Sequence, residues 1–131
     1  MNNQNRFPKM YISFDIEASG PTPGKYSMLT LGACIVGETD VQFYREIQPI
    51  TPQFNLESMK VASKGLRCLD EVKSLPYYNP QSPNFNPDKV LRRLQEQGHP
   101  PESVMSDYAD WVTKNTQGFI PVEAAAPIKF D

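Results

Sequence analysis

The hydrophobic positions of this sequence follow two spacings, and each predicts one kind of element. Aromatic and β-branched residues over 10–16 (MYISFDI) are followed by a Ser-Gly-Pro-Thr-Pro-Gly run, which predicts a buried strand that ends in a loop. A nearly continuous apolar run predicts a second strand over 28–36. A hairpin turn at 37–40 would lead into a third strand over 41–47. These strands are expected to form an antiparallel meander.

The rest of the chain predicts helices and one more strand. Apolar residues at helical spacing predict one helix over 55–69 and another over 102–117, the latter with its Trp and Met side chains in the core. Asn86-Pro87-Asp88 is a typical helix start, and Gly98 is a typical helix end. The segment 120–126 predicts a fourth strand, which a helical crossover would bring beside the first. Together the elements predict an α/β fold.

The length of 131 residues suits a single domain over 1–131. We expect a flexible N-terminus at 1–9. We also expect a proline-rich loop at 70–86, because the 13 prolines of the chain are about twice the average usage. Aromatic side chains in this loop would either stack on nucleic acid bases or, in the simpler interpretation, attach the loop to the core. These side chains are Tyr77, Tyr78 and Phe85.

Charge and composition narrow the possible partners. The net charge is −2, and Arg92-Arg93 is the densest basic run, so single-stranded or short nucleic acid is favoured over tightly bound duplex. No apolar run approaches the ~20 residues of a membrane span, and the N-terminus lacks the apolar segment of a signal peptide. We therefore expect a cytoplasmic protein with no membrane contact. Cys34 and Cys68 have no metal-binding spacing.

Two acids in the first strand are the strongest chemical signal. Asp15 and Glu17 stand in an apolar strand, where burial penalises charge, and the two-residue period of a strand points both to one face. Two carboxylates at a strand end can hold a hard cation such as Mg²⁺ or Mn²⁺. The alternative is a pair of solvated acids at an exposed strand end.

The surrounding residues resemble a known family. Residues 12–20 (ISFDIEASG) and 28–33 (MLTLGA) are similar to the first motif and second strand of the DEDD, or DnaQ-like, 3′-to-5′ exonucleases. Residues 124–131 (AAAPIKFD) resemble the second motif, in which a strand leads to an aspartate at a helix start. The resemblance implies a ribonuclease H-like mixed sheet with flanking helices. The C-terminal part of that fold would be missing, since the chain stops at Asp131.

The resemblance also implies the site and its activity. Asp15, Glu17 and Asp131 would be the catalytic residues and the ligands of a two-metal Mg²⁺ or Mn²⁺ site. The expected activity is metal-dependent 3′-to-5′ hydrolysis of phosphodiester bonds at the end of single-stranded or short nucleic acid. The loop after the first strand would hold the terminal nucleotide, with plain turn chemistry as the alternative for Ser19. The substrate-binding residues implied are Ala18, Ser19, Gly20 and Met28.

One part of the family pattern is not found. The third motif, with a histidine or tyrosine base and a last aspartate, has no match, and His99 lies in a turn-like context that suits a surface loop. Three explanations stay open. Another part of the gene product supplies the motif, a second chain supplies it, or the protein is an inactive exonuclease-like binding module. We expect self-association or a partner chain that completes the fold.

Overall fold

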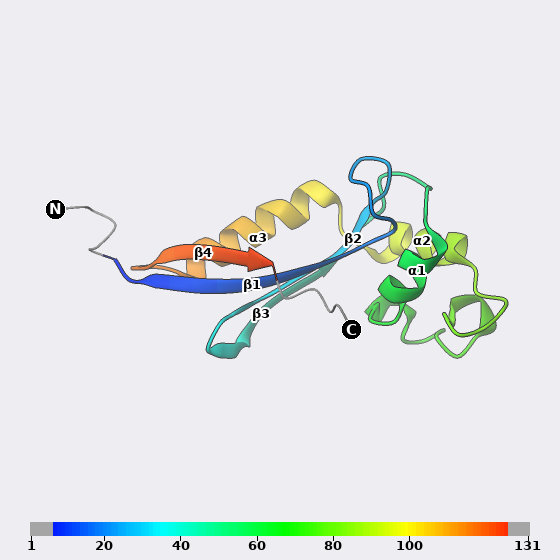
Figure 1. Ribbon diagram of the computed structural model, residues 1–131, viewed down its shortest axis with the longest axis horizontal. Coiled ribbons are helices and arrows are strands. Elements are labelled where there is room, and N and C mark those ends of the chain that lie inside the picture. Colours follow the sequence, from blue (N-terminus) through cyan, green and yellow to red (C-terminus); the bar gives the residue numbers. More distant parts are fainter. Residues whose placement is uncertain (1–6, 126–131) are drawn as a thin grey trace.

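The computed structural model describes residues 7–125, which build one four-stranded mixed sheet. Strands β1 (Lys9–Ala18), β2 (Met28–Ile35) and β3 (Glu38–Glu46) form the antiparallel meander, and β4 (Ile120–Ala125) pairs in parallel with β1. The sheet order is β3-β2-β1-β4 (Figure 1). This confirms the predicted α/β class and is consistent with a partial ribonuclease H-like fold.

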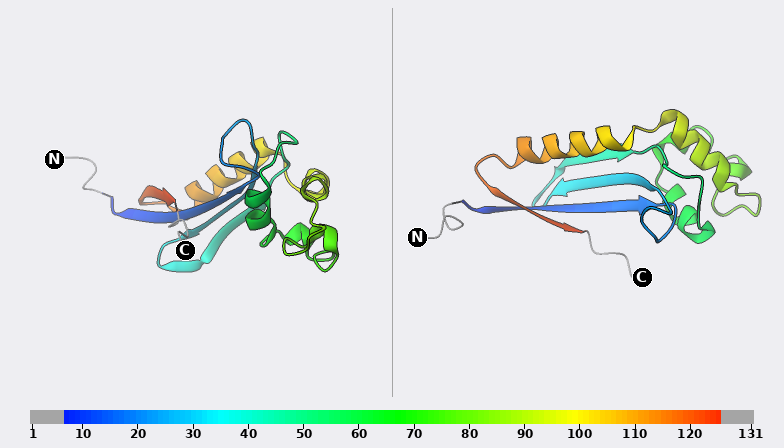
Figure 2. Two further views of the ribbon diagram at one scale, coloured as in Figure 1. Left: turned by 45° about the vertical axis from the view of Figure 1, so that its right-hand side comes forward. Right: turned by 90° about the horizontal axis from the view of Figure 1, so that it is seen from above.

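Residues 7–125 form three α-helices, which lie along one face and at one end of the sheet (Figure 1). Helix α3 (Pro101–Asn115) runs along one face of the sheet. Helices α1 (Leu56–Ser63) and α2 (Pro87–Gln97) gather at the end where β1 finishes and β2 begins (Figures 1 and 2). Short 3₁₀ turns occur at Arg67–Leu69 and Pro76–Tyr78. Within residues 7–125, no helix combines the length and the apolar character that crossing a membrane requires.

The core has two parts, one for each group of helices. Between α3 and the sheet lie buried residues from both layers, including Ile12, Leu31, Phe43 and Val104. A second cluster joins the start of β2 to α1 and α2. Its buried members include Leu29, Met59, Ala62, Leu69, Val90 and Leu94. At one end of the sheet, α1 contacts the face that lies opposite α3.

The helix predicted over 55–69 is too long, because α1 ends at Ser63. Asn55 caps its start, and its side-chain oxygen accepts a 3.0 Å hydrogen bond from the backbone N–H of Ser58. The chain leaves the helix around Gly65 and resumes as a 3₁₀ turn, whose first backbone N–H groups donate to Glu46. A contact with a distant strand therefore overrides the local helical spacing.

Helix α3 confirms the predicted helix, with one correction to its inner face. Val104 is buried, and Tyr108 and Trp111 pack against the same core cluster. Met105, predicted to pack in the core, is 46% exposed. A residue next to an inward-facing position is turned by about 100° around the helix, which takes Met105 away from the sheet.

Several local predictions are confirmed and two are wrong. Asn86 caps α2 through a 3.4 Å hydrogen bond from the backbone N–H of Lys89, and Gly98 ends the helix. In the proline-rich loop, Tyr78 and Phe85 pack on the second cluster, as the simpler interpretation predicts. Tyr77 is 51% exposed, so that interpretation is wrong for it. The hairpin turn is also shorter than predicted, because β3 already starts at Glu38.

Candidate metal centre

Asp15 and Glu17 lie on the face of the sheet opposite α3, near the end of β1. In the antiparallel register, Asp15 stands opposite Gly32, and Glu17 stands opposite Thr30. These residues border a hollow of about 240 Å³ between the sheet and α1, which we call the acidic hollow. Its lining is Asp15, Glu17, Thr30, Gly32, Tyr44, Val61, Ala62 and Gly65.

The strand β2 gives the acidic hollow its shape. Gly32 has no side chain, so space is left beside Asp15 on this face of the sheet. Thr30 is buried, and its hydroxyl accepts a 3.1 Å hydrogen bond from the backbone N–H of Glu17. The small and hydroxyl side chains of β2 therefore hold the acidic part of β1 in place without filling the hollow.

Electrostatics favour a cation at this position. Burial raises the pKa of the Glu17 carboxyl, and the negative charge of Asp15 raises this pKa further. A divalent cation between the two side chains would offset both effects, because it attracts both carboxylates. Mg²⁺ and Mn²⁺ prefer oxygen ligands, and Mg²⁺ commonly uses one or two carboxylates while it keeps several waters. The donor set present here fits such an ion.

The third predicted ligand, Asp131, lies outside the described residues, as does the rest of the second motif from 126 onward. Among residues 7–125, no group of three or more His, Cys, Asp or Glu side chains is placed to hold one metal ion. The structure thus brings Asp15 and Glu17 together as predicted, and the role of Asp131 stays a prediction.

A second polar group beside the acidic hollow was missed by the sequence analysis. The Glu46 carboxylate accepts hydrogen bonds from the backbone N–H groups of Arg67 and Cys68, the latter at 2.9 Å. It also accepts a hydrogen bond from the hydroxyl of Tyr44, whose ring forms one wall of the hollow. The guanidinium carbon of Arg67 lies 4.2 Å from the centre of that ring.

This network keeps Tyr44 protonated. Burial raises the pKa of the Tyr44 hydroxyl, and the hydrogen bond to Glu46 raises it further. Tyr44 is thus a fixed, neutral wall of the hollow. The sequence signal for this group was the two-residue spacing of Tyr44 and Glu46, which places both side chains on one face of β3. In the sheet, this is the face that carries Asp15. Nothing in the sequence pointed to Arg67 as their partner.

The predicted substrate-binding loop is held tightly within the fold. The hydroxyl of Ser19 is fully buried, accepts a 2.9 Å hydrogen bond from the backbone N–H of Ser27 and donates to the carbonyl of Gln53 at 3.2 Å. Turn chemistry therefore accounts for the Ser19 side chain. Ala18 and Met28 are half-buried, and Gly20 lies directly against another side chain of the loop. Contact of these residues with a substrate stays a prediction.

His99 lies apart from the acidic hollow, on the exposed loop between α2 and α3. Its backbone N–H donates a 2.8 Å hydrogen bond to the carbonyl of Glu46, and its carbonyl accepts one from Gln48 at 2.9 Å. The predicted surface-loop position is confirmed. The backbone of His99, rather than its imidazole, connects this loop to the end of β3.

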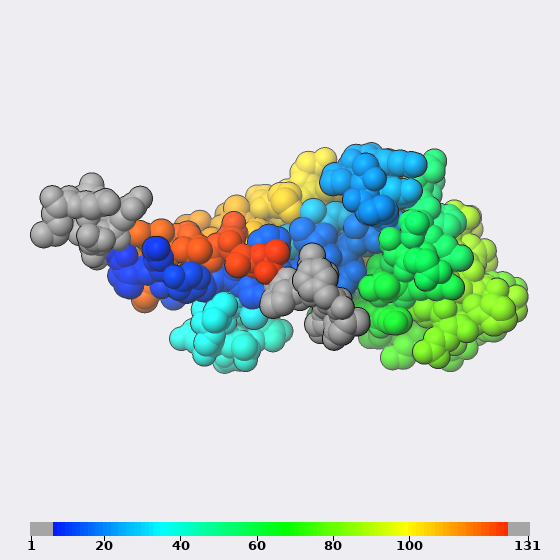
Figure 3. Space-filling model, viewed as in Figure 1, coloured from blue at the N-terminus to red at the C-terminus, as the bar shows by residue number. Residues whose placement is uncertain are grey.

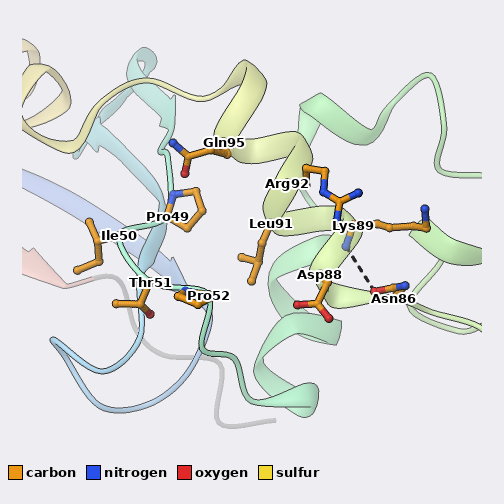
Figure 4. A pocket seen from close by; sticks show the side chains of 10 residues that line it. All are labelled: Pro49, Ile50, Thr51, Pro52, Asn86, Asp88, Lys89, Leu91, Arg92 and Gln95. Atoms are coloured by element: carbon orange, nitrogen blue, oxygen red, sulfur yellow. Dashed lines mark hydrogen bonds between the residues drawn. The ribbon is translucent and has the colours of Figure 1, made fainter.

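A larger hollow of about 680 Å³ lies elsewhere, between the segment 49–52 and α2 (Figure 4). Its walls combine prolines from the segment with polar residues of the helix, among them Lys89, Arg92 and Gln95. It shares no residue with the acidic hollow and contains none of the predicted site residues. Size alone therefore does not identify the site, and the carboxylate pair marks the smaller hollow as the candidate.

The fold and the carboxylate pair together describe an α/β protein with two acids in a hollow on one face of its sheet. No family model matches the chain. A protein of Escherichia coli named "3′-5′ DNA exonuclease Cap18" is 43% identical over 61 residues, which are 47% of this chain and 33% of that protein. The match spans about a third of the length of this curated relative. This partial homology supports a nuclease function in general terms.

Proposed function

We propose that this protein is a metal-dependent 3′-to-5′ exonuclease of the DEDD type that acts on the ends of single-stranded or short nucleic acid. The observation that carries the proposal is the pairing of Asp15 and Glu17 on one sheet face, in a hollow where the pKa of Glu17 is raised. The name of the partial homologue supports the same direction of hydrolysis and makes DNA the first substrate to test.

Asp15 and Glu17 would hold Mg²⁺ or Mn²⁺, together with Asp131 from outside the described residues. When bound, two such ions would supply an activated water and stabilise the leaving 3′ oxygen. Thr30 would keep the β1 backbone at Glu17 in place, and Tyr44 would close the hollow on the β3 side. Both residues have a positioning role in this proposal.

The test is digestion of a 5′-labelled single-stranded DNA oligonucleotide by the purified chain with Mn²⁺. Wild type is expected to produce a ladder that shortens from the 3′ end, and Asp15→Asn or Glu17→Gln is expected to abolish it. Asp110→Asn is the matched control, because Asp110 is an exposed acid on α3, across the sheet from the hollow. A ladder that survives in Asp15→Asn would overturn the proposed site. No cleavage by wild type would mean that this chain alone is either an incomplete enzyme or a non-catalytic binding module.

Metal binding gives a second measurement that does not depend on turnover. A ligand that binds only the folded state at a hundred times its Kd stabilises that state by about 2.7 kcal/mol. Mn²⁺ is therefore expected to raise the Tm of wild type and of Asp110→Asn, but not of Asp15→Asn. Stabilisation by Mn²⁺ without cleavage would instead favour the non-catalytic binding module.

A partner for the sheet is also part of the proposal. Beyond α1, the face that carries Asp15 continues to Tyr11, which is half exposed, and to β4, whose outer edge pairs with no described strand. We propose that a second copy or another chain covers this region, because open strand edges associate readily. A monodisperse monomer in light scattering of the purified chain would contradict this.

A further inference from the structure

Ser63, the last residue of α1, carries an unsatisfied buried hydroxyl. The residue is 4% exposed, and its side-chain oxygen has no hydrogen-bond partner within residues 7–125. Buried polar groups in proteins are almost always hydrogen-bonded, and exceptions call for an explanation such as a bound group. A hydroxyl that has both its donor and its acceptor free beside a hollow can bond to water or to a molecule held in that hollow.

Ser63 lines a second hollow, of about 370 Å³, which we call the Ser63 hollow. It is formed where the end of α1 meets the 3₁₀ turns and the proline-rich loop. Its other lining residues are Lys64, Gly65, Leu66, Leu69, Asp70, Lys73, Tyr78, Asn79, Pro80 and Gln81. Gly65 also lines the acidic hollow, so the two spaces adjoin across a residue without a side chain.

The side chains around the Ser63 hollow provide three kinds of contact. Lys64 and Lys73 are exposed cations. The Nζ of Lys73 lies 3.9 Å from the Oδ1 of Asp70, and Lys64 forms no ion pair in the described part of the chain. Tyr78 packs on the second core cluster, and the half-exposed remainder of its side chain borders the hollow with an aromatic ring. The amide side chains of Asn79 and Gln81 offer hydrogen-bond donors and acceptors. Cations, an aromatic ring and amides together suit a nucleotide, which has a phosphate, a flat base and polar base edges.

We propose that the Ser63 hollow binds a nucleotide of the substrate strand that lies inward from the one being removed. This inference rests on the proposed function, which places the 3′ end of the strand in the acidic hollow. From there the strand would cross Gly65. The phosphate would then lie near Lys64 and Lys73. The Ser63 hydroxyl would turn by one side-chain rotation to donate a hydrogen bond to the bound nucleotide.

The test compares oligonucleotides of increasing length on the full chain. The probes are fluorescently labelled thymidine 5′-monophosphate, which has only the terminal nucleotide, and labelled thymidine tetranucleotide and octanucleotide with phosphorothioate linkages at the 3′ end. Kd is measured by anisotropy with Ca²⁺ present. Ser63→Ala is expected to weaken binding of the two oligonucleotides by about five- to tenfold, the usual effect of one hydrogen bond, and to leave the mononucleotide unchanged. If the hydroxyl were merely an unused buried group, Ser63→Ala would leave all three affinities unchanged.

The lysines give an independent measurement on variants with little risk to folding. Each phosphate contact on a single strand contributes about 0.7 to the slope of log K against log salt concentration, so Lys64→Ala combined with Lys73→Ala is expected to reduce that slope by about 1.4. The matched control is Arg92→Ala, which removes an exposed cation from the larger hollow.

The outcomes separate this inference from the proposed function. Equal binding by wild type and Ser63→Ala, with an unchanged salt slope in the lysine variant, would overturn the Ser63 hollow as a nucleotide site and leave the nuclease proposal intact. A loss of affinity in Arg92→Ala alone would also overturn it, in favour of the larger hollow. Failure of wild type to bind any probe would overturn the proposed function itself, and this inference with it.

Discussion

The backbones of Ser19 and Ser27 are joined by a 2.9 Å hydrogen bond from the N–H of Ser19 to the carbonyl of Ser27, and the hydroxyl of Ser19 accepts a second from the N–H of Ser27. These bonds close the loop that follows Glu17. The Ser27 hydroxyl in turn accepts hydrogen bonds from the backbone N–H groups of Ile50 and Thr51, at 2.9 and 3.2 Å. In the space-filling view, the closed loop stands beside α1 at the end of the sheet (Figure 3).

Removing the Ser27 hydroxyl should therefore destabilise the protein. Ser27→Ala removes a buried hydroxyl that two partly buried backbone N–H groups use as their acceptor, and we expect a loss of about 1–2 kcal/mol in the free energy of unfolding, measured in urea. The control is Ser106→Ala at an exposed position of α3, which should change stability by at most about 0.5 kcal/mol. Equal stability of the two variants would contradict the role given to Ser27.

Gly20 should tolerate no side chain. A Cβ at this position would clash with the ring of Tyr26, so Gly20→Ala must displace the ring or the loop, at a cost of about 1–3 kcal/mol. Gly65→Ala is the matched control, because a Cβ there meets no atom within 4 Å. Urea unfolding should separate the two variants. A neutral Gly20→Ala would show that the loop adapts freely.

Glu17 should make stability depend on pH. Its pKa is raised in the folded state above the ordinary value of 4.5, so the folded state keeps the proton to a higher pH than the unfolded state does. The resulting stabilisation is complete below about pH 4.5 and is lost as the pH rises through the folded-state pKa. Without divalent cations, Glu17→Gln is therefore expected to raise Tm near neutral pH.

The same measurement in acid provides the check on this sign. The gain in Tm from Glu17→Gln should shrink as the pH falls toward about 4, where Glu17 is protonated in both states. Glu38→Gln, an exposed acid on β3, should show neither effect. A gain in Tm that is the same at both pH values would mean that the amide stabilises the fold for some reason other than charge.

Glu46 should matter for stability without being a metal ligand. Its carboxylate accepts hydrogen bonds from Tyr44, Arg67 and Cys68, so Glu46→Ala is expected to cost about 2–4 kcal/mol in the free energy of unfolding. Glu38→Ala on the same strand should be close to neutral. Mn²⁺ should still stabilise the Glu46→Ala variant at temperatures where that variant is folded. If Mn²⁺ no longer stabilises the variant, Glu46 belongs among the metal ligands instead.

The thiol of Cys68 should react slowly. Burial raises its pKa to about 12, and the carboxylate of Glu46 contributes to the rise, so the thiol stays protonated near pH 8. In the Cys34→Ser variant, the remaining thiol is expected to react with a disulfide reagent at least about a hundredfold more slowly than a free cysteine. Rapid labelling of that variant under native conditions would contradict the raised pKa of the half-buried Cys68 thiol.

The sequence predicted those features that depend on local spacing. The two-residue period placed Asp15 and Glu17 on one face, and turn residues located the ends of the strands. The end of α1 at Ser63 was not predictable in this way, because it depends on Glu46, which is 21 residues from Arg67 in the chain. The Ser63 hollow could not be predicted from the sequence either, since it exists only where the end of α1 and the proline-rich loop meet in space.

The parallel pairing of β1 with β4 has a consequence for the order in which the chain folds. Lys9 pairs with Ile120, whereas the strands of the meander are joined by short connections. Closing a long loop costs entropy before the contact yields any stabilisation, so the meander is expected to form first and β4 to dock late. Pulse-labelled hydrogen exchange during refolding should find the amides of β4 protected after those of β2. The candidate site would then acquire its neighbouring strand only in the last step of folding.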